Sequence, residues 1–340
     1  MYSALVLASA SALMVSTVFG QSLTINSFGG AYEDAHRKCV IAPFEDATGS
    51  TVEIVTAYSA DALARLRAQR DAPEFDVVHF SGGQEIVAAQ EGLLLPIDEA
   101  SLVNAGDLYD IARSNLEGGE GPAYSIAAIG LVYNVEKTPQ APQSWVDVLD
   151  PIYGRHLVLT DISNAYGMLG FLMINQINGG DLGNIEPGLD AVAELLDGGA
   201  VVVSTSPELQ RAFAEGDAWL APYASDYAFT LRSSGLPANF AQAAEGAPAS
   251  FITASLVVGR DNKDLALQFI DMSISKEAQE CFAHELRYSP TNMTVELPDA
   301  VAADVAYGAG AASGLLRFDP TVIEANRSDW VDMWNRTISR

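Results

Sequence analysis

Short apolar runs alternate with longer helical segments along almost the whole of this chain, and this alternation constrains its fold most strongly. Residues 75–79, for example, have the length and composition of a buried strand, and Gly82-Gly83 then opens a helix. A regular succession of strands and helices predicts α/β architecture. We expect strands at 22–26, 51–56, 75–79, 126–133, 156–159, 201–203, 219–223 and 250–258, helices at 31–48, 60–69, 164–178, 189–196, 207–215 and 265–286, and a segment at 299–340 that is helical at both ends.

The length of the chain predicts more than one lobe. A chain of 340 residues is too long for a single hydrophobic core, so two lobes are the default expectation. Pro139, Pro142 and Trp145 mark a linker between the first α/β region and a second one.

The first residues have the character of an export signal. Residues 5–18 are apolar and uncharged but too short to span a bilayer. Val18 and Gly20 place small side chains three and one residues before a cut, as signal peptidase requires. We therefore expect a secretory signal at 1–20 and Gln21 as the first mature residue. The usual basic leading segment is missing, since the first positive charge is Arg37, and a buried core helix is the alternative.

The charge balance disfavours some classes of partner. The formal net charge is −26, whereas nucleic acids and anionic membrane surfaces are bound by basic surfaces. The acidity could steer a cationic ligand toward a binding cleft, or it could simply solvate the surface.

The two cysteines, Cys39 and Cys281, lie in helical segments far apart in the sequence. Export to an oxidising compartment permits a disulfide between them. Two unpaired buried thiols are the alternative, and the sequence leaves both open.

The sequence patterns that accompany most enzyme classes are missing. The chain has no phosphate-binding loop, and its Gly29-Gly30 turn lacks the third glycine of a dinucleotide fingerprint. It has no nucleophile elbow, and its four histidines are scattered without metal-ligand spacing. We therefore expect no catalytic residue, no metal and no cofactor. A secreted two-lobed hydrolase and an iron(III) receptor with Tyr223 and Tyr227 as hard ligands are the alternatives.

Ordered blocks over nearly the whole mature chain resemble the polyamine-type (spermidine/putrescine-like) extracellular solute-binding proteins of ABC transporters. The resemblance is carried by the order and spacing of blocks that are each weak alone. In chain order these blocks are Ser27-Phe28-Gly29-Gly30-Ala31-Tyr32, Pro43-Phe44-Glu45, Phe75-Asp76-Val77-Val78, Gly92-Leu93-Leu94, Pro96-Ile97-Asp98, Gly130-Leu131-Val132-Tyr133-Asn134, Asn262-Lys263, Glu277-Ala278-Gln279, Tyr288-Ser289-Pro290-Thr291-Asn292 and Trp334-Asn335.

The resemblance implies a type II periplasmic binding-protein fold, in which two α/β lobes are joined by crossing strands. The ligand of such a protein lies between the lobes, at the carboxyl ends of strands. Lobe I would comprise 21–128 with 255–305, and lobe II would comprise 129–254 with 306–340. A protein of this family is a periplasmic monomer that captures a small molecule and delivers it to the membrane permease of an ABC importer.

The expected site residues lie at strand ends and at the crossing strand. Tyr223-Ala224-Ser225-Asp226 resembles the Trp-x-x-Asp segment with which polyamine receptors hold an amine, although Asp226 could instead cap a helix. Ser163 and Asn164 could likewise act as helix caps. The ligand-binding residues that we expect are Ser27, Phe28, Gly29, Tyr32, Phe80, Ser81, Asp161, Ser163, Asn164, Tyr166, Tyr223, Asp226, Phe251, Ile252 and Tyr288.

Two departures from the family pattern change the expected ligand. Ile252 stands where polyamine receptors carry a further acidic residue, and a glutamate expected near Asn164 is also absent. A long diamine needs an anion at each end. We therefore predict a smaller ligand with at most one cationic group, such as an amino acid-like, betaine-like or other amine-bearing metabolite.

Overall fold

The computed structural model describes residues 21–308, 310 and 314–339, so the signal expected at 1–20 lies outside the described residues. The strands are β1 Ser22–Ser27, β2 Thr51–Thr56, β3 Val77–Ser81, β4 Leu94–Leu95, β5 Ala123–Asn134, β6 Val158–Thr160, β7 Val201–Val203, β8 Leu220–Ala224, β9 Ala238–Ala241, β10 Ala247–Val257 and β11 Leu315–Leu316. The α-helices are α1 Gly30–His36, α2 Ala42–Thr48, α3 Ser59–Ala68, α4 Gln84–Gln90, α5 Asp110–Glu117, α6 Ala165–Ile177, α7 Glu186–Asp197, α8 Ser206–Glu215, α9 Ser225–Ser233, α10 Lys263–Ser273, α11 Lys276–Leu286, α12 Asp299–Ala302 and α14 Pro320–Ile338.

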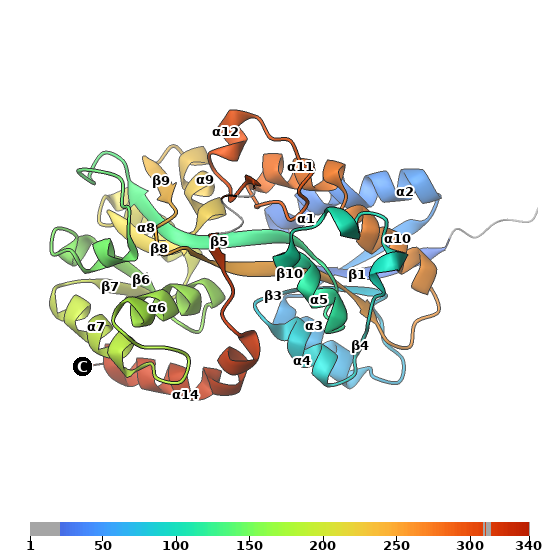
Figure 1. The fold of residues 1–340 in the computed structure, drawn as a ribbon, viewed down its shortest axis with the longest axis horizontal. Coiled ribbons are helices and arrows are strands. Elements are labelled where there is room, and N and C mark those ends of the chain that lie inside the picture. Colours follow the sequence, from blue (N-terminus) through green and yellow to red (C-terminus); the bar gives the residue numbers. More distant parts are fainter. Residues whose placement is uncertain (1–20, 309, 311–313, 340) are drawn as a thin grey trace, which may run out of the picture.

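Two long strands connect the halves of the molecule. The main sheet has the order β2-β1-β3-β10-β5-β8, and β10 runs antiparallel to both β3 and β5. All residues of β5 and β10 are buried, and the two strands cross the middle of Figure 1 from one half to the other. The prediction of α/β architecture is confirmed.

The apolar side chains form two large cores, one in each half of the molecule. What we call the first core gathers residues from 23–128 and 247–315, and the second core gathers residues from 127–243 and α14. Strand β5 contributes Tyr124 to the first core and Leu131 to the second. The expected division of the chain between the lobes (21–128 with 255–305, and 129–254 with 306–340) stays a prediction.

The expected helix at 265–286 is wrong in one respect, because the chain breaks it into α10 and α11. Ser275 takes an extended conformation between them, and its hydroxyl accepts a hydrogen bond from the amide of Ala278 at 3.3 Å. A serine in this position caps a new helix rather than continuing the old one. The helix expected at 31–48 contains a π-helical stretch, Arg37–Ile41, and ends at Gly49 (φ 69°) as predicted.

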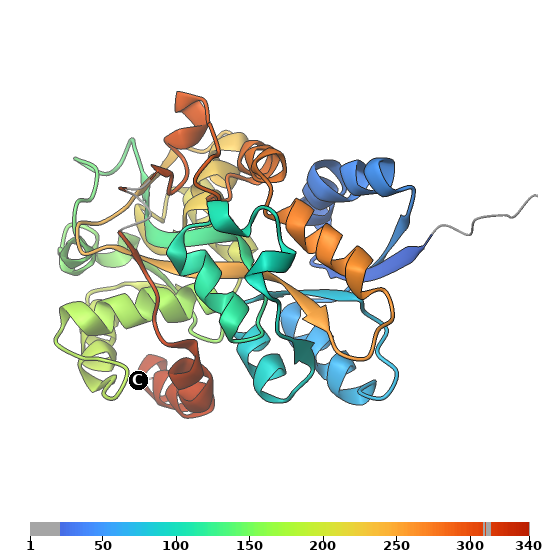
Figure 2. The same ribbon diagram turned by 45° about the vertical axis from the view of Figure 1, so that its right-hand side comes forward.

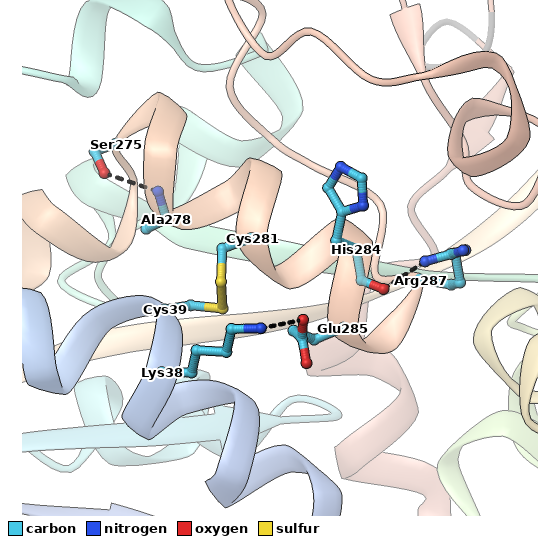
Figure 3. The surroundings of a disulfide bond; sticks show 8 residues. All are labelled: Lys38, Cys39, Ser275, Ala278, Cys281, His284, Glu285 and Arg287. Carbon is cyan, nitrogen blue, oxygen red and sulfur yellow. Dashed lines mark hydrogen bonds and ion pairs between the residues drawn. A yellow bond between two sulfur atoms is a disulfide. The ribbon is translucent and has the colours of Figure 1, made fainter.

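The two cysteines form a disulfide, so the alternative of two unpaired buried thiols is wrong. Cys39 and Cys281 have their Cα atoms 5.5 Å apart and are 242 residues apart in the chain. The bond joins the π-helical stretch to α11, next to an ion pair of 2.7 Å between Lys38 and Glu285 (Figure 3). No free cysteine occurs in the described part of the chain.

Two buried histidines lie side by side in the half that contains the first core. The rings of His36 and His79 have centroids 4.8 Å apart, and both side chains are fully buried. The ring nitrogens of His36 have no hydrogen-bond partner among the described residues. Burial lowers the pKa of His79 to about 4 and lowers the pKa of His36 well below its usual value.

This histidine pair predicts a loss of stability in acid. Below about pH 6.5 the unfolded chain binds more protons at these positions than the folded chain, so the free energy of unfolding falls as the pH falls toward 4. His36→Phe keeps an aromatic ring beside Tyr32 and Phe282 but removes one titrating group. Urea unfolding at about pH 7 and pH 5 should show a smaller acid loss for the variant, by about 1.4 kcal/mol per pH unit. Identical losses would contradict this account.

Candidate ligand-binding site

Asp226 has the most unusual surroundings of any expected site residue. It lies in the first turn of α9, directly after β8. Its Oδ1 atom is buried and has no hydrogen-bond partner among the residues that the structure describes. The N-cap of α9 is Ala224, so the alternative reading of Asp226 as the helix cap is wrong. A buried carboxylate oxygen without a partner is costly, and such atoms occur where a ligand completes the pairing.

Three tyrosines contributed by different elements lie near enough to this carboxylate for its charge to raise their pKa values. Tyr166 comes from α6, Tyr223 from β8 and Tyr288 from the segment after α11. The Tyr166 and Tyr223 rings meet edge to face, with centroids 5.4 Å apart. Burial and then the charge of Asp226 raise the pKa of Tyr166 and of Tyr288 well above the usual value for tyrosine. The same effect of burial raises the pKa of Asp226 to about 7.

The tyrosine on β8 is held in place by α8. The hydroxyl of Tyr223 is 2.7 Å from the hydroxyl of Ser206, and the hydroxyl of Tyr227 donates to the Ser206 carbonyl. Tyr227 was predicted only as a possible iron ligand, and Ser206 was not predicted. Both tyrosine hydroxyls are already used in local hydrogen bonds. No group of three histidine, cysteine, aspartate or glutamate side chains that could hold a metal ion occurs within the described residues.

A second aromatic wall comes from the start of α1. Tyr32 shares a hydrogen bond with the hydroxyl of Tyr124 on β5, and its ring packs on Phe28 at 4.7 Å. The Phe28 ring lies parallel to that of Tyr58, which is 65% exposed and was not predicted. Tyr32 also contributes to the raised pKa of Tyr288. Tyr288 is therefore close to both Tyr32 and Asp226.

The tight turn before α1 brings this wall to the end of β1. Gly29 has a positive φ of 73°, and a Cβ atom there would lie 3.3 Å from the Thr56 side chain. The Gly29 amide donates to the hydroxyl of Ser27 at 3.3 Å. At the end of β3, the Ser81 amide donates to the hydroxyl of Ser59 at 2.9 Å. Gly29 thus occupies a position where another residue would be strained.

Several of the expected site residues make hydrogen bonds or apolar contacts within the protein itself. The carboxylate of Asp161 accepts hydrogen bonds from Ser163 and from the Trp334 indole. Asn164 caps α6, which was the alternative to ligand contact for this residue. Phe80 is fully buried in a smaller apolar cluster beneath α3 and α4. The side chains of Phe251 and Ile252 are almost completely buried in the first core. The sequence could place these residues near strand ends but could not show which way their side chains point.

The two halves also meet beside α6. A Cβ atom on Gly82, in the turn before α4, would lie 3.3 Å from the Cβ of Ala165 at the start of α6. A neighbouring pocket contains Glu85, whose carboxylate accepts from the Gly83 amide at 3.2 Å. Burial raises the pKa of Glu85 to about 7. None of the tyrosines around Asp226 lines this pocket.

No described helix is long and apolar enough to be a membrane span.

Comparisons with known proteins give one consistent class. Residues 40–309 match the family of bacterial extracellular solute-binding proteins. A γ-aminobutyric acid-binding protein of Pseudomonas aeruginosa is 25% identical over 287 residues, which cover 80% of this chain and 77% of that protein.

Solved structures show the same fold. An ABC transporter protein from Clostridium perfringens superposes with a TM-score of 0.82 at 24% identity, over 93% of this chain and 99% of that one. A structure described as the Atu4243-GABA receptor superposes with a TM-score of 0.74 at 19% identity, over 93% and 97% of the two chains.

The predicted two-lobed binding-protein fold is therefore confirmed. The resemblance to solute-binding proteins is confirmed at the level of the class, and none of these three relatives is described as a polyamine receptor. The chain belongs to the family of bacterial extracellular solute-binding proteins.

Proposed function

We propose that this protein works in the periplasm as the monomeric receptor of an ABC importer and that its cargo is a small solute with a single cationic amine. An ω-amino acid such as γ-aminobutyrate is the first candidate. The observation that carries the proposal is the buried, unpartnered Oδ1 of Asp226 among Tyr166, Tyr223 and Tyr288. The γ-aminobutyric acid-binding relative supports the same chemical class.

The surroundings of Asp226 suit an ammonium group. A carboxylate and an ammonium group in a site shielded from water form a charge-assisted hydrogen bond, which is about twice as strong as a neutral one. Aromatic faces add cation–π attraction of about 0.5–2 kcal/mol. Both contributions act on the same end of the ligand, which is the end that carries the positive charge.

The rest of the site suits a ligand with no second cation. Ile252 stands where polyamine receptors would have a further carboxylate, and a glutamate expected near Asn164 is absent, so a second ammonium group would find no such anion. The raised pKa values of Tyr32, Tyr166 and Tyr288 keep their hydroxyls protonated at neutral pH. Protonated hydroxyls can donate hydrogen bonds to the carboxylate of a zwitterion.

Binding between the halves links the site to transport. A ligand that contacts α6, α9 and Tyr288 at once favours the closed arrangement, because the open one lacks some of these contacts. The membrane permease would then recognise the closed receptor. The family that the chain matches consists of extracellular solute-binding proteins, which supports binding without catalysis.

A thermal-shift and calorimetry panel tests this proposal. We expect γ-aminobutyrate or a related monoamine to bind with a stoichiometry of one and to raise the free energy of unfolding by about 2.7 kcal/mol at a hundredfold excess over Kd. Putrescine and spermidine should stabilise the protein much less. Tight binding of these polyamines, with no response to monoamines or zwitterions, would contradict the proposed cargo. Elemental analysis and a turnover assay in the same panel test the iron(III) receptor and the hydrolase.

A further inference from the structure

An ionic cluster joins α9 to the segment that follows α11. Asp304 accepts from the guanidinium of Arg232 on α9 and from Nε of Arg287 at 3.1 Å. The Arg287 guanidinium also lies over the ring of Phe229, 4.2 Å from its centroid. The Arg287 and Asp304 side chains are only 14% and 15% exposed, so solvent and salt screen their attraction only in part. We call these four residues, Arg232, Arg287, Asp304 and Phe229, the clasp.

The clasp connects the two halves of the molecule. Helix α9 packs into the second core through Ala228 and Leu231, whereas α11 packs into the first core through Phe282. Asp304 is tied to the first core by its neighbour Ala306, which is buried there. Helix α12, just before Asp304, stands close to α9 and α11 at the top of Figure 1 and Figure 2.

Each partner in the clasp has a direct connection to the candidate site. Asp226, Phe229 and Arg232 follow one another at intervals of three residues along α9, so they lie on one side of the helix. On the opposing segment, Arg287 directly precedes Tyr288. The next residue, Ser289, pairs with Ile126 of β5 through hydrogen bonds of 2.9 and 3.0 Å. Tyr288 is therefore fixed between the clasp and the crossing strand.

The backbone at Arg287 is held in an unfavourable conformation. Its φ of 58° makes it the one non-glycine residue with positive φ in the described part of the chain. An ordinary side chain in this region costs about 1 kcal/mol and persists where surrounding contacts require it. Its side chain also donates to the carbonyls of Ala283 and His284, the second of which appears in Figure 3.

We propose that the clasp is made on closure of the two halves and sets the fraction of closed receptor, and thereby how long cargo is retained. Arg287 and Asp304 are thus positioning residues that act through Tyr288 and α9 without contacting the ligand. The part of this inference that concerns cargo retention rests on the proposed function of the site. The part that concerns closure does not.

Single-molecule FRET between dyes on α3 and α7 tests the clasp without any ligand. We expect Asp304→Asn and Arg287→Gly to reduce the closed fraction about tenfold, a typical size for coupling by charged contacts. Glycine at position 287 suits a positive φ, so this variant removes the side chain without straining the backbone. Glu91→Gln, which breaks an exposed pair with Arg67 within the first half, is the matched control and should leave the closed fraction unchanged.

The outcomes test the proposed clasp and the proposed cargo independently. An unchanged closed fraction in both variants overturns the clasp, even if their unfolding temperatures fall. If the closed fraction falls, the dissociation rate of γ-aminobutyrate should rise by a similar factor while its association rate changes little. If γ-aminobutyrate binds neither the wild type nor the variants, the proposed cargo fails, and the FRET result still decides the clasp.

Discussion

Replacement of Asp226 by asparagine should weaken the binding of γ-aminobutyrate by about 10- to 100-fold, because a hydrogen bond to a charged group contributes about 1.5–3 kcal/mol. The amide has nearly the same shape as the carboxylate, so the loss would report charge rather than packing. Isothermal titration calorimetry at about pH 8 measures the change. Asp329→Asn, at an exposed position on α14, is the matched control. Equal affinities of wild type and Asp226→Asn would remove Asp226 from the site.

The pH dependence of binding gives this prediction a second signature. The pKa of Asp226 is raised to about 7, so its carboxyl is mostly neutral at pH 6 and mostly ionised at pH 8. An ammonium ligand pairs with the ionised form, so wild-type affinity should rise about tenfold between these two pH values. Asp226→Asn should bind with the same low affinity at both.

The stability of the ligand-free protein should fall as the pH rises, whereas the affinity for the ligand should rise. Because the folded-state pKa of Asp226 is raised from 3.8 to about 7, the folded chain binds the extra proton in this range and loses stability as the pH rises through it. Asp226→Asn removes this penalty, so at about pH 8 the free energy of unfolding should increase by something on the order of 2 kcal/mol. A residue that destabilises the fold while it improves binding has a functional role.

Loss of the disulfide should produce the largest change in stability. Closing a loop with a sequence separation of 242 residues restricts the unfolded chain, and the chain-entropy model gives about 5.5 kcal/mol for such a loop before any strain is subtracted. Urea unfolding of the Cys39→Ser/Cys281→Ser double variant should show a free energy of unfolding lower by about 4 kcal/mol.

Reduction of the wild type with a phosphine provides the control, since it should reproduce the loss and should not affect the double variant. A double variant as stable as the oxidised wild type would contradict the stabilising role of the bond.

The sequence predicted the elements of the fold better than their contacts. Alternating apolar runs located the main strands, and Gly49 ended its helix as predicted, because both signals are local. Ser275 was a local signal that was overlooked, since a serine directly before a segment with helical periodicity is a typical helix start. The clasp joins Arg232 to Asp304, which are 72 residues apart, and no local pattern indicates such a pairing.

The same distinction applies to the site. Asp226 and Tyr223 were predicted from a segment of four residues. That Tyr166 and Tyr288 lie around the same carboxylate follows only from the packing of α6 and α11 in three dimensions. Phe80 and Ser81 are neighbours at one strand end, yet Phe80 is fully buried and Ser81, the last residue of β3, is not.

The most direct test of the proposed function is native mass spectrometry of the receptor purified without refolding, with the co-purified small molecule identified after release. The account predicts a single bound solute with one amine group per receptor, and its loss from Asp226→Asn. A bound diamine or triamine, or a bound ferric ion, would contradict it.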